Sequence, residues 1–199
     1  MNKFGLIYDH VIQKLRSGLS EELTYHSIDH TLDVLKQSEN IALAENITDE
    51  EELYLLKIAA LYHDSGFLFI YQGHEARGCK IAKSELPAFG LSTEQIEIIC
   101  GLIMATKIPQ SASTSLQEVI CDADLDYLGR DDYEVISNKL YPEFLKQGYV
   151  KNEKEWLEKQ IGFFQSHHYY TTWAKEHRSP VKHRHLRELK SIQTRNTFK

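Results

Sequence analysis

A histidine and an aspartate stand together at the end of a long apolar run. Residues 53–62 are mostly hydrophobic, and His63 and Asp64 follow them directly. Burying a carboxylate costs free energy unless the carboxylate is paired or bound to a metal. Imidazole and carboxylate are also ligand types that suit a divalent transition ion. On its own, however, the pair is more typical of a helix end at which Asp64 meets solvent, so a metal site needs further ligands elsewhere in the chain.

Two more histidines occur upstream, in the segment YHSIDHTLDV at residues 25–34. His26 and His30 are four residues apart, so they share a face if both are helical. If Ser27 is the helix N-cap, His26 precedes the helix and still neighbours its first turn. Both arrangements keep the two imidazoles close to each other.

Three acids at alternate positions follow the apolar pair at 119–120. In a helix, Asp122, Asp124 and Asp126 fan out over a wide arc, so at most two of them can face a common site. EF-hand loops also space acids alternately, but the sixth loop position here is not glycine and the twelfth, Tyr133, is not glutamate. We therefore exclude a calcium loop.

The order His, His-Asp, Asp on successive helices resembles the HD-domain superfamily of metal-dependent phosphohydrolases, over about residues 22–130. The resemblance implies an all-α fold, a compact multi-helix bundle with the metal site among its central helices. Asp122 is the alternative last ligand, but the family motif reads Ala-Asp followed within a residue or two by Leu, which favours Asp124. The metal ligands implied by the resemblance are His30, His63, Asp64 and Asp124, and Asp64 is also expected to be catalytic.

The segment around His26 is similar to the YHNxxHAxDV signature of cyclic-nucleotide phosphodiesterase catalytic domains. Ser27 replaces the asparagine of that signature, and Thr31 replaces its alanine. In those domains the first histidine donates a proton to the leaving oxygen and the second binds metal. The likeness therefore implies that His26 is a general acid. The alternative is a histidine that caps the helix or supports a ligand.

Many HD-domain proteins carry a His-Glu pair after the doublet and an Ile-x-x-His one helix later. Here His74 and Glu75 match the first pattern, but residues 103–107 read IMATK, without a histidine. A second metal held by protein ligands alone is therefore in doubt. We expect His74 to approach the cavity and to bind a second ion weakly or to contact phosphate.

Three cations are candidates to balance the charge of a phosphate group. Lys107 has the best case, because it follows Ala105-Thr106 beside a loop, and we count it among the catalytic residues. Arg77 and Arg130 are the other two candidates. The alternative for each is a surface position.

The elements that must position these residues are predicted to be helices. Helix-start patterns begin at Thr48, Ser92 and Ser115, and Asp131 and Asn152 are expected caps. Apolar residues follow at helical spacing, and no long stretch alternates as a strand would. The segment at 50–64 is apolar almost all round, which predicts a central, buried helix. We predict seven to nine helices and no sheet, over about residues 3–18, 27–45, 50–64, 74–85, 92–106, 115–127, 131–148, 152–166 and 180–193.

The composition is that of an ordinary globular protein, with 42% hydrophobic and 26% charged residues. The sequence contains no run of about 18 apolar residues, so no membrane span is expected. The first residues lack the apolar segment of a signal peptide. We therefore expect a cytoplasmic protein. The three cysteines Cys79, Cys100 and Cys121 lie far apart, which favours buried thiols over disulfides or a thiolate zinc site.

The net charge of −6 hides an asymmetry. Residues 175–199 contain eight Lys or Arg and two acids, a local net charge of +6, so the first 174 residues carry −12. An acidic body argues against wholesale nucleic-acid binding. We predict a single domain over residues 1–178 and a basic C-terminal tail over residues 179–199, which is a solvated helix or a loose end.

Together these features predict hydrolysis of a phosphate ester by metal-activated water. The expected substrate is a nucleotide, either a cyclic phosphodiester or a nucleoside monophosphate, and the expected cofactor is a divalent ion (Mn, Fe, Co, Ni, Zn or Mg). The alternative is a non-catalytic HD-fold module that binds metal or nucleotide and acts as a sensor or scaffold; the intact ligand set favours an enzyme. An oxygenase with an iron pair would need more ligands. The predicted partner is thus a small molecule, not a membrane or nucleic acid, and homodimerisation stays open.

Overall fold

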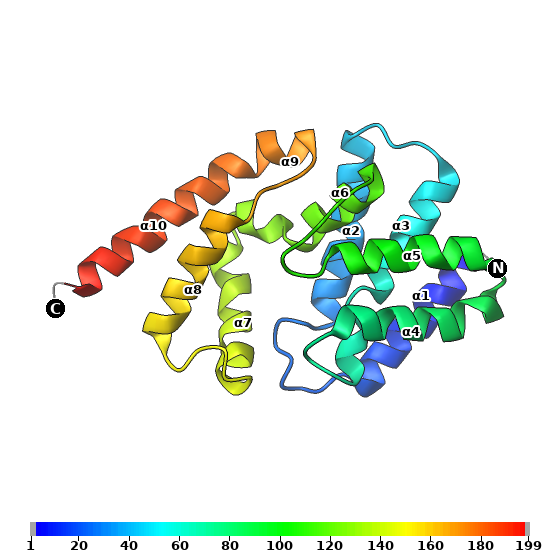
Figure 1. Ribbon diagram of the computed structural model, residues 1–199, viewed down its shortest axis with the longest axis horizontal. Helices are drawn as coiled ribbons and strands as arrows, with labels where there is room; N and C mark the ends of the chain where they lie inside the picture. The colour runs from blue at the N-terminus through cyan, green and yellow to red at the C-terminus, as the bar shows by residue number, and fades with distance from the viewer. Residues whose placement is uncertain (1–2, 198–199) are drawn as a thin grey trace.

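The computed structural model of the protein describes residues 3–197, which form an all-helical fold (Figure 1). No strand occurs in this range, and none of its helices is long and apolar enough to cross a membrane. The α-helices are α1 (Lys3–Gly18), α2 (Ile28–Ala44), α3 (Glu50–Tyr62), α4 (His74–Glu85), α5 (Thr93–Ala105), α6 (Ser115–Asp124), α7 (Tyr133–Lys146), α8 (Glu153–Ser166), α9 (Thr172–His177) and α10 (Ser179–Thr197). Three short 3₁₀ helices join them: η1 (Ser65–Leu68), η2 (Leu86–Phe89) and η3 (Asp126–Gly129).

The helix starts agree with the predicted caps to within one residue. Ser92 and Gln95 form the expected capping box of α5, and the Asn152 side chain accepts a hydrogen bond from Glu155 N at the start of α8. In α3 and α6 the caps are Asp49 and Thr114, each one residue away from the predicted cap. In both cases the capping residue is the extended one that directly precedes the first helical turn, as N-cap geometry requires.

Helix α3 lies at the centre of the larger hydrophobic core, as predicted from its all-round apolar surface. Its residues 58–61 are fully buried, and α1, α2 and α5 pack around it. The core cluster also draws members from α1, α2, α4, α5 and α6. The two polar residues that follow α3 are therefore delivered to the interior of the protein.

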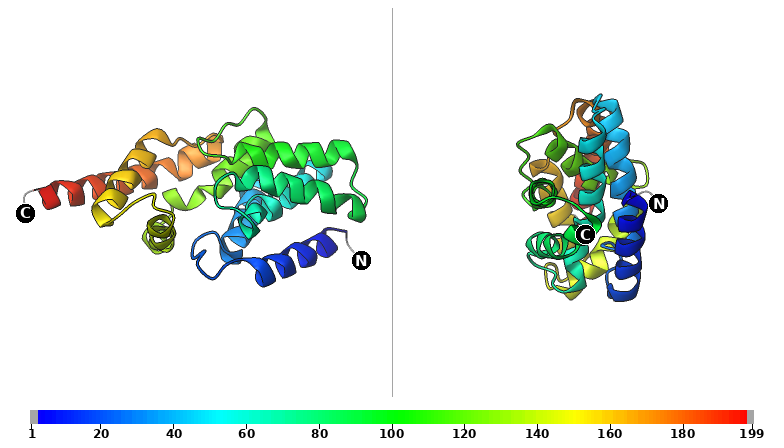
Figure 2. Two further views of the ribbon diagram at one scale, coloured as in Figure 1. Left: turned by 60° about the horizontal axis from the view of Figure 1, so that its bottom comes forward. Right: turned by 90° about the vertical axis from the view of Figure 1, so that its right-hand side faces the viewer.

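The helices divide into two groups along the long axis of the molecule (Figures 1 and 2). Helices α1–α6 form one end, and α7, α8 and α10 form the other, with the two termini at opposite ends. A second hydrophobic cluster holds the latter group together and includes Leu128, Tyr133, Phe164 and Leu189. Residues 179–197 form helix α10, which packs on α8 and η3 and buries Leu189.

Two breaks in the chain direction bear on the site. The predicted helix at 115–127 ends earlier, at Asp124, because the chain tightens at Leu125 into η3. After α3, the 3₁₀ turn η1 packs against the start of α4 so closely that a Cβ at Gly66 would lie 1.9 Å from the His74 carbonyl oxygen. Only glycine permits this approach, which brings the start of α4 next to the end of α3.

Candidate metal centre

Four side chains converge in the interior: His30 from α2, His63 and Asp64 from the end of α3, and Asp124 from the end of α6. His30 Nε2 lies 3.2 Å from Asp124 Oδ1 and 3.4 Å from His63 Nε2. Asp64 Oδ2 lies 3.3 Å from His63 Nε2 and 3.5 Å from His30 Nε2. Ligands about 2.0–2.1 Å from a tetrahedral ion are themselves about 3.3 Å apart. His30, His63 and Asp124 thus meet at a spacing that suits one metal ion, and Asp64 lies beside the two histidines.

The nitrogen and oxygen atoms that face one another in the cluster carry lone pairs, which fits a cation between them. Asp64 Oδ2 is buried and accepts no hydrogen bond from any residue that the structure describes. His63 Nδ1 lies 2.8 Å from the Ala60 carbonyl oxygen. Because a carbonyl only accepts, Nδ1 carries the hydrogen and the Nε2 lone pair of His63 faces the cluster. The group of His30, His63 and Asp124 could hold a metal ion.

The charges of the cluster are strongly coupled. Burial alone would lower the pKa of His63, but the carboxylates of Asp64 and Asp124 raise this pKa to about 9. Burial opposes ionisation of Asp64, yet His63 and His74 hold the pKa of Asp64 well below its usual range. Without an ion, protonation of His63 therefore balances the charge of these acids. A bound metal ion would supply this positive charge instead, so metal affinity should depend on pH.

The three alternating acids of residues 122–126 separate into three different environments. Only Asp124 faces the cluster. Asp122 accepts hydrogen bonds from Tyr170 N and from Thr171 N and Oγ1, all within 2.8 Å. Asp126 pairs with Arg178, at 2.6 Å. The geometry therefore favours Asp124 over Asp122, the other candidate for the last ligand.

His26 lies beside the cluster, and its ring is held by an acid that the sequence did not single out. Ser27 is the N-cap of α2, so His26 precedes the helix. Glu143 from α7 is only 2% exposed, and its Oε2 lies 2.5 Å from His26 Nδ1. Its Oε1 accepts hydrogen bonds from the backbone N–H groups of Tyr25 and His26. With Nδ1 engaged in this way, Nε2 of His26 is the nitrogen left for the cavity.

Glu143 carries a full charge in this position. Burial would raise its pKa, but the hydrogen bond and charge of His26, together with the backbone donors, hold the pKa of Glu143 below its usual value. The hydroxyl of Tyr71 also donates to Oε2, at 3.2 Å. One signal in the sequence points to this residue: Glu143 interrupts the apolar face that Ile136 and Leu140 begin at helical spacing.

His74 approaches the site as expected, on the other side of Asp64. Its Nδ1 donates to the Tyr71 carbonyl at 3.0 Å, and its Nε2 lies 3.3 Å from Asp64 Oδ1 and 3.7 Å from Glu75 Oε1. Burial opposes protonation of His74, but Asp64 raises its pKa. The ring of Phe67 stacks between His26 and His74, with centroid distances of 4.1 and 3.9 Å. Asp64 thus directs one oxygen to the cluster and the other to His74.

The structure does not bring the three candidate cations into the site. Lys107 is exposed in the turn after α5, whereas its neighbours Thr106 and Ile108 line the cavity. The guanidinium of Arg77 lies 4.1 Å over the ring of Phe69, and Arg77 is not among the described residues that line the cavity.

Arg130 is fully occupied by neighbouring acids. It lies 2.8 Å from Asp33, 2.9 Å from Asp132 and 3.4 Å from Asp126. These ion pairs leave Arg130 little capacity to bind a phosphate group. This arginine joins α2 to η3 and so supports the turn that directs Asp124 inward.

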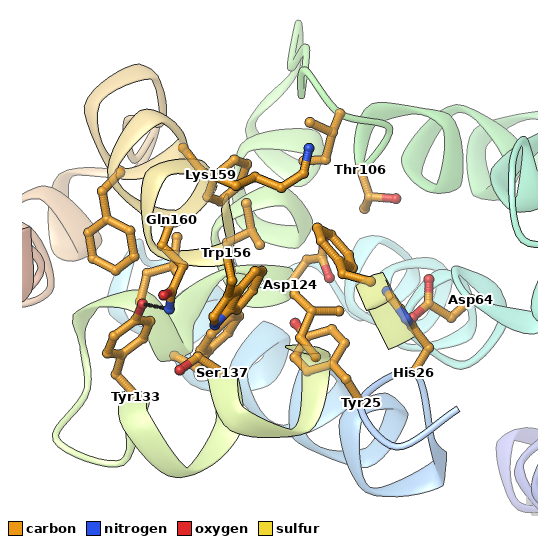
Figure 3. A pocket seen from close by; sticks show the side chains of 18 of the residues that line it. Tyr25, His26, Asp64, Thr106, Asp124, Tyr133, Ser137, Trp156, Lys159 and Gln160 are labelled. Carbon is orange, nitrogen blue, oxygen red and sulfur yellow. Dashed lines mark hydrogen bonds between the residues drawn. The ribbon is translucent and has the colours of Figure 1, made fainter. Parts of the chain in front are cut away.

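A cavity of about 310 Å³ opens from the cluster and runs between η3, α7 and α8 (Figure 3). His26 and Asp64 lie at one end, and Tyr133, Ser137 and Gln160 lie at the other (Figure 3). A small molecule in this cavity therefore reaches the donor atoms from the side of α7 and α8.

The comparisons with known proteins agree with this geometry. A family model described as HD domain matches residues 27–128, just over half of the chain. No curated protein and no solved structure matches the chain. The matched residues include all four converging side chains, whereas His26 and Glu143 lie outside them.

Proposed function

The chain belongs to the HD-domain family, a superfamily of metal-dependent phosphohydrolases, and on this premise we propose that it hydrolyses the phosphate ester of a nucleotide. HD domains bind divalent metals. The observation that carries the proposal is the convergence of His30, His63, Asp64 and Asp124. One atom of this cluster, the buried Oδ2 of Asp64, has no hydrogen-bond donor among the described residues.

The donor set fits a divalent ion and leaves room for a substrate. Two imidazoles and two carboxylates suit Mn, Fe, Co, Ni or Zn, and also Mg where waters complete the coordination. A bound ion supplies a nucleophilic water and polarises the phosphoryl oxygen. Asp64 and Asp124 line the cavity, so these ligands are accessible from the space that a substrate would occupy.

His26 has the position expected of a proton donor. Its Nδ1 is held by Glu143, so Nε2 can offer a proton to the oxygen that leaves phosphorus. The ionised Glu143 stabilises the protonated ring and fixes its orientation. His74 and Glu75 lie on the far side of Asp64 and would contact a phosphate oxygen or help to hold a second ion.

A nucleotide substrate, a cyclic phosphodiester or a nucleoside monophosphate, rests on two observations. The His26–His30 segment is similar to the signature of cyclic-nucleotide phosphodiesterases. The cavity beside the cluster also has aromatic walls, which suit the flat face of a base.

The test combines metal analysis with hydrolysis assays. Purified protein, reconstituted with Mn, Fe, Co, Ni or Zn, should hold close to one equivalent of metal and cleave bis(4-nitrophenyl) phosphate, cyclic nucleotides or nucleoside monophosphates. Asp64→Ala should lose both metal and activity. Asp9→Ala, which removes an exposed aspartate on α1, should lose neither.

Two outcomes would contradict the proposal in different ways. Protein that binds no metal after reconstitution would refute the metal centre itself. Protein that binds metal through Asp64 but cleaves no phosphate ester would support the alternative function of a sensor or scaffold.

A further inference from the structure

The cavity changes character along its length. At the cluster end it is lined by the polar side chains of His26, Asp64, His74, Glu75 and Asp124. The end between α7 and α8 is lined by large apolar side chains, among them Tyr133, Leu140, Phe144, Trp156, Phe163 and Phe164. Tyr133 and Trp156 are labelled in Figure 3. Such a wall attracts an apolar group by removing its surface from water.

The polar groups at the apolar end are already engaged within the protein. Gln160 Nε2 donates to the Tyr133 hydroxyl at 2.6 Å. The Ser137 hydroxyl donates to the Glu134 carbonyl at 3.3 Å, one turn earlier in α7. A bound group therefore finds few free hydrogen-bond partners there, and the loss of its own hydration would cost free energy if it were strongly polar.

The positive charge of the cavity is also confined. Among the described lining residues, Lys159 is the only Lys or Arg. It is exposed, and its ammonium lies 5.7 Å from the centre of the Phe144 ring and 5.8 Å from that of Tyr149. Chains of phosphates are normally bound by several cations or by helix N-termini. The cavity thus offers countercharge for one phosphate at the metal and little for further phosphates.

The size of the cavity suits a small organic group. Its volume of about 310 Å³ lies at the lower end of the range for small-molecule sites. The rings of Trp156 and Phe144 meet edge to face, with centroids 5.4 Å apart, and those of Tyr133 and Phe164 do so at 5.0 Å. Walls made of such rings pack well against a flat ring.

We propose that this cavity binds the leaving group of an ester with a single phosphate, and that this leaving group carries an aromatic ring. The inference rests on the proposed function, since it places the phosphate at the metal centre. Nucleoside monophosphates belong to this substrate class because a base has a flat aromatic face. Nucleoside triphosphates do not belong to it, because the cavity offers little positive charge for further phosphates.

Binding of two phosphonates tests the inference without turnover. Phenylphosphonate and methylphosphonate share a non-hydrolysable head group and differ only in the ring. The chain has two tryptophans, Trp156 in the cavity wall and Trp173 on α9, so Trp173→Phe leaves fluorescence that reports on the cavity alone. The metal-loaded Trp173→Phe protein should bind phenylphosphonate at least about 10-fold more tightly than methylphosphonate, as expected for an apolar pocket. In the same assay it should bind a nucleoside monophosphate more tightly than the triphosphate.

A matched pair of variants places the preference in the cavity. Ser137→Leu, made in the Trp173→Phe protein, fills the apolar end and should abolish the preference for phenylphosphonate. The Glu134 carbonyl loses the serine hydroxyl but keeps its backbone hydrogen bond within α7. Val135→Leu lies on the same helix with 65% of its surface exposed, and it should keep the preference.

The results separate this inference from the proposed function. Equal affinities for the two phosphonates, in protein that still cleaves 4-nitrophenyl phosphate, would overturn the inference and leave the hydrolase standing. A clear preference for phenylphosphonate in protein that cleaves no ester would support the cavity assignment and refute the hydrolase. A nucleoside triphosphate that binds as well as the monophosphate would overturn the restriction to one phosphate.

Discussion

Replacing Glu143 by glutamine should slow proton donation by His26 while leaving the metal cluster intact. The carboxylate accepts from His26 Nδ1 at 2.5 Å in a buried setting, and glutamine keeps its shape but not its charge. A hydrogen bond to a charged group contributes about 1.5–3 kcal/mol. If this amount is lost only when the leaving oxygen needs a proton, kcat falls by about 10- to 100-fold. His26→Ala, which removes the donor itself, should cost about 100- to 10,000-fold.

The assay compares two esters that differ in their need for a proton. An alkyl phosphodiester has a basic leaving oxygen and should show the full loss in Glu143→Gln. A 4-nitrophenyl ester leaves as a stabilised phenolate and should be cleaved at nearly the wild-type rate. Glu134→Gln, an exposed change on the same helix, is the control and should affect neither ester.

The difference between the esters guards against a structural explanation. Glu143 also accepts the backbone N–H groups of Tyr25 and His26, so a general disturbance of this loop would slow both substrates and lower the metal content. Equal losses on both esters would therefore refute the positioning role of Glu143. An unchanged kcat of His26→Ala on the alkyl ester would refute the assignment of His26 as the proton donor.

Two further predictions concern residues away from the cluster. Burial lowers the pKa of His167 to about 3, and neither ring nitrogen has a partner among the described residues. His167 takes up a proton near pH 6.5 in the unfolded chain but not in the folded protein. The free energy of unfolding should therefore fall as the pH drops from about 6.5 towards 3, by about 2 kcal/mol between pH 6.5 and 5. Urea unfolding of His167→Phe should show a smaller fall over the same range. Lys107→Ala should change kcat/KM by less than about twofold, because the side chain is exposed; a loss of about 10-fold or more would restore the predicted phosphate contact.

The helices and the four converging side chains are the features of the structure that the sequence predicts most clearly. The second half of helix α3 is largely buried, as its apolar pattern predicts, and His63 and Asp64 follow it in the interior. The pair by itself would have fitted a helix end at the surface equally well. His30 and Asp124 could be placed only through their resemblance to a family pattern. Their contact depends on how α2 and α6 pack on each other, which spacing along the chain does not reveal.

The errors arise where side-chain direction decides the outcome. Arg77 and Lys107 lie within a few residues of the cavity along the chain, but neither is among the described residues that line it. Arg130 is drawn to Asp33, which lies 97 residues earlier. The role of Glu143 is hidden from the sequence for a related reason, because its partner His26 lies 117 residues away. Helical periodicity identifies the buried face of an element but not its partner on another element.

The distribution of these residues along the chain separates the chemistry from the choice of substrate. The family match at 27–128 contains the four side chains that would hold the metal. The residues that hold His26 in place and form the apolar end of the cavity come from α7 and α8, beyond the matched region. A shared metal centre can thus serve different substrates if the helices that follow it differ. For this chain, exchanging side chains on α7 and α8 should alter which ester is cleaved, whereas exchanging the four donors should abolish cleavage of every ester.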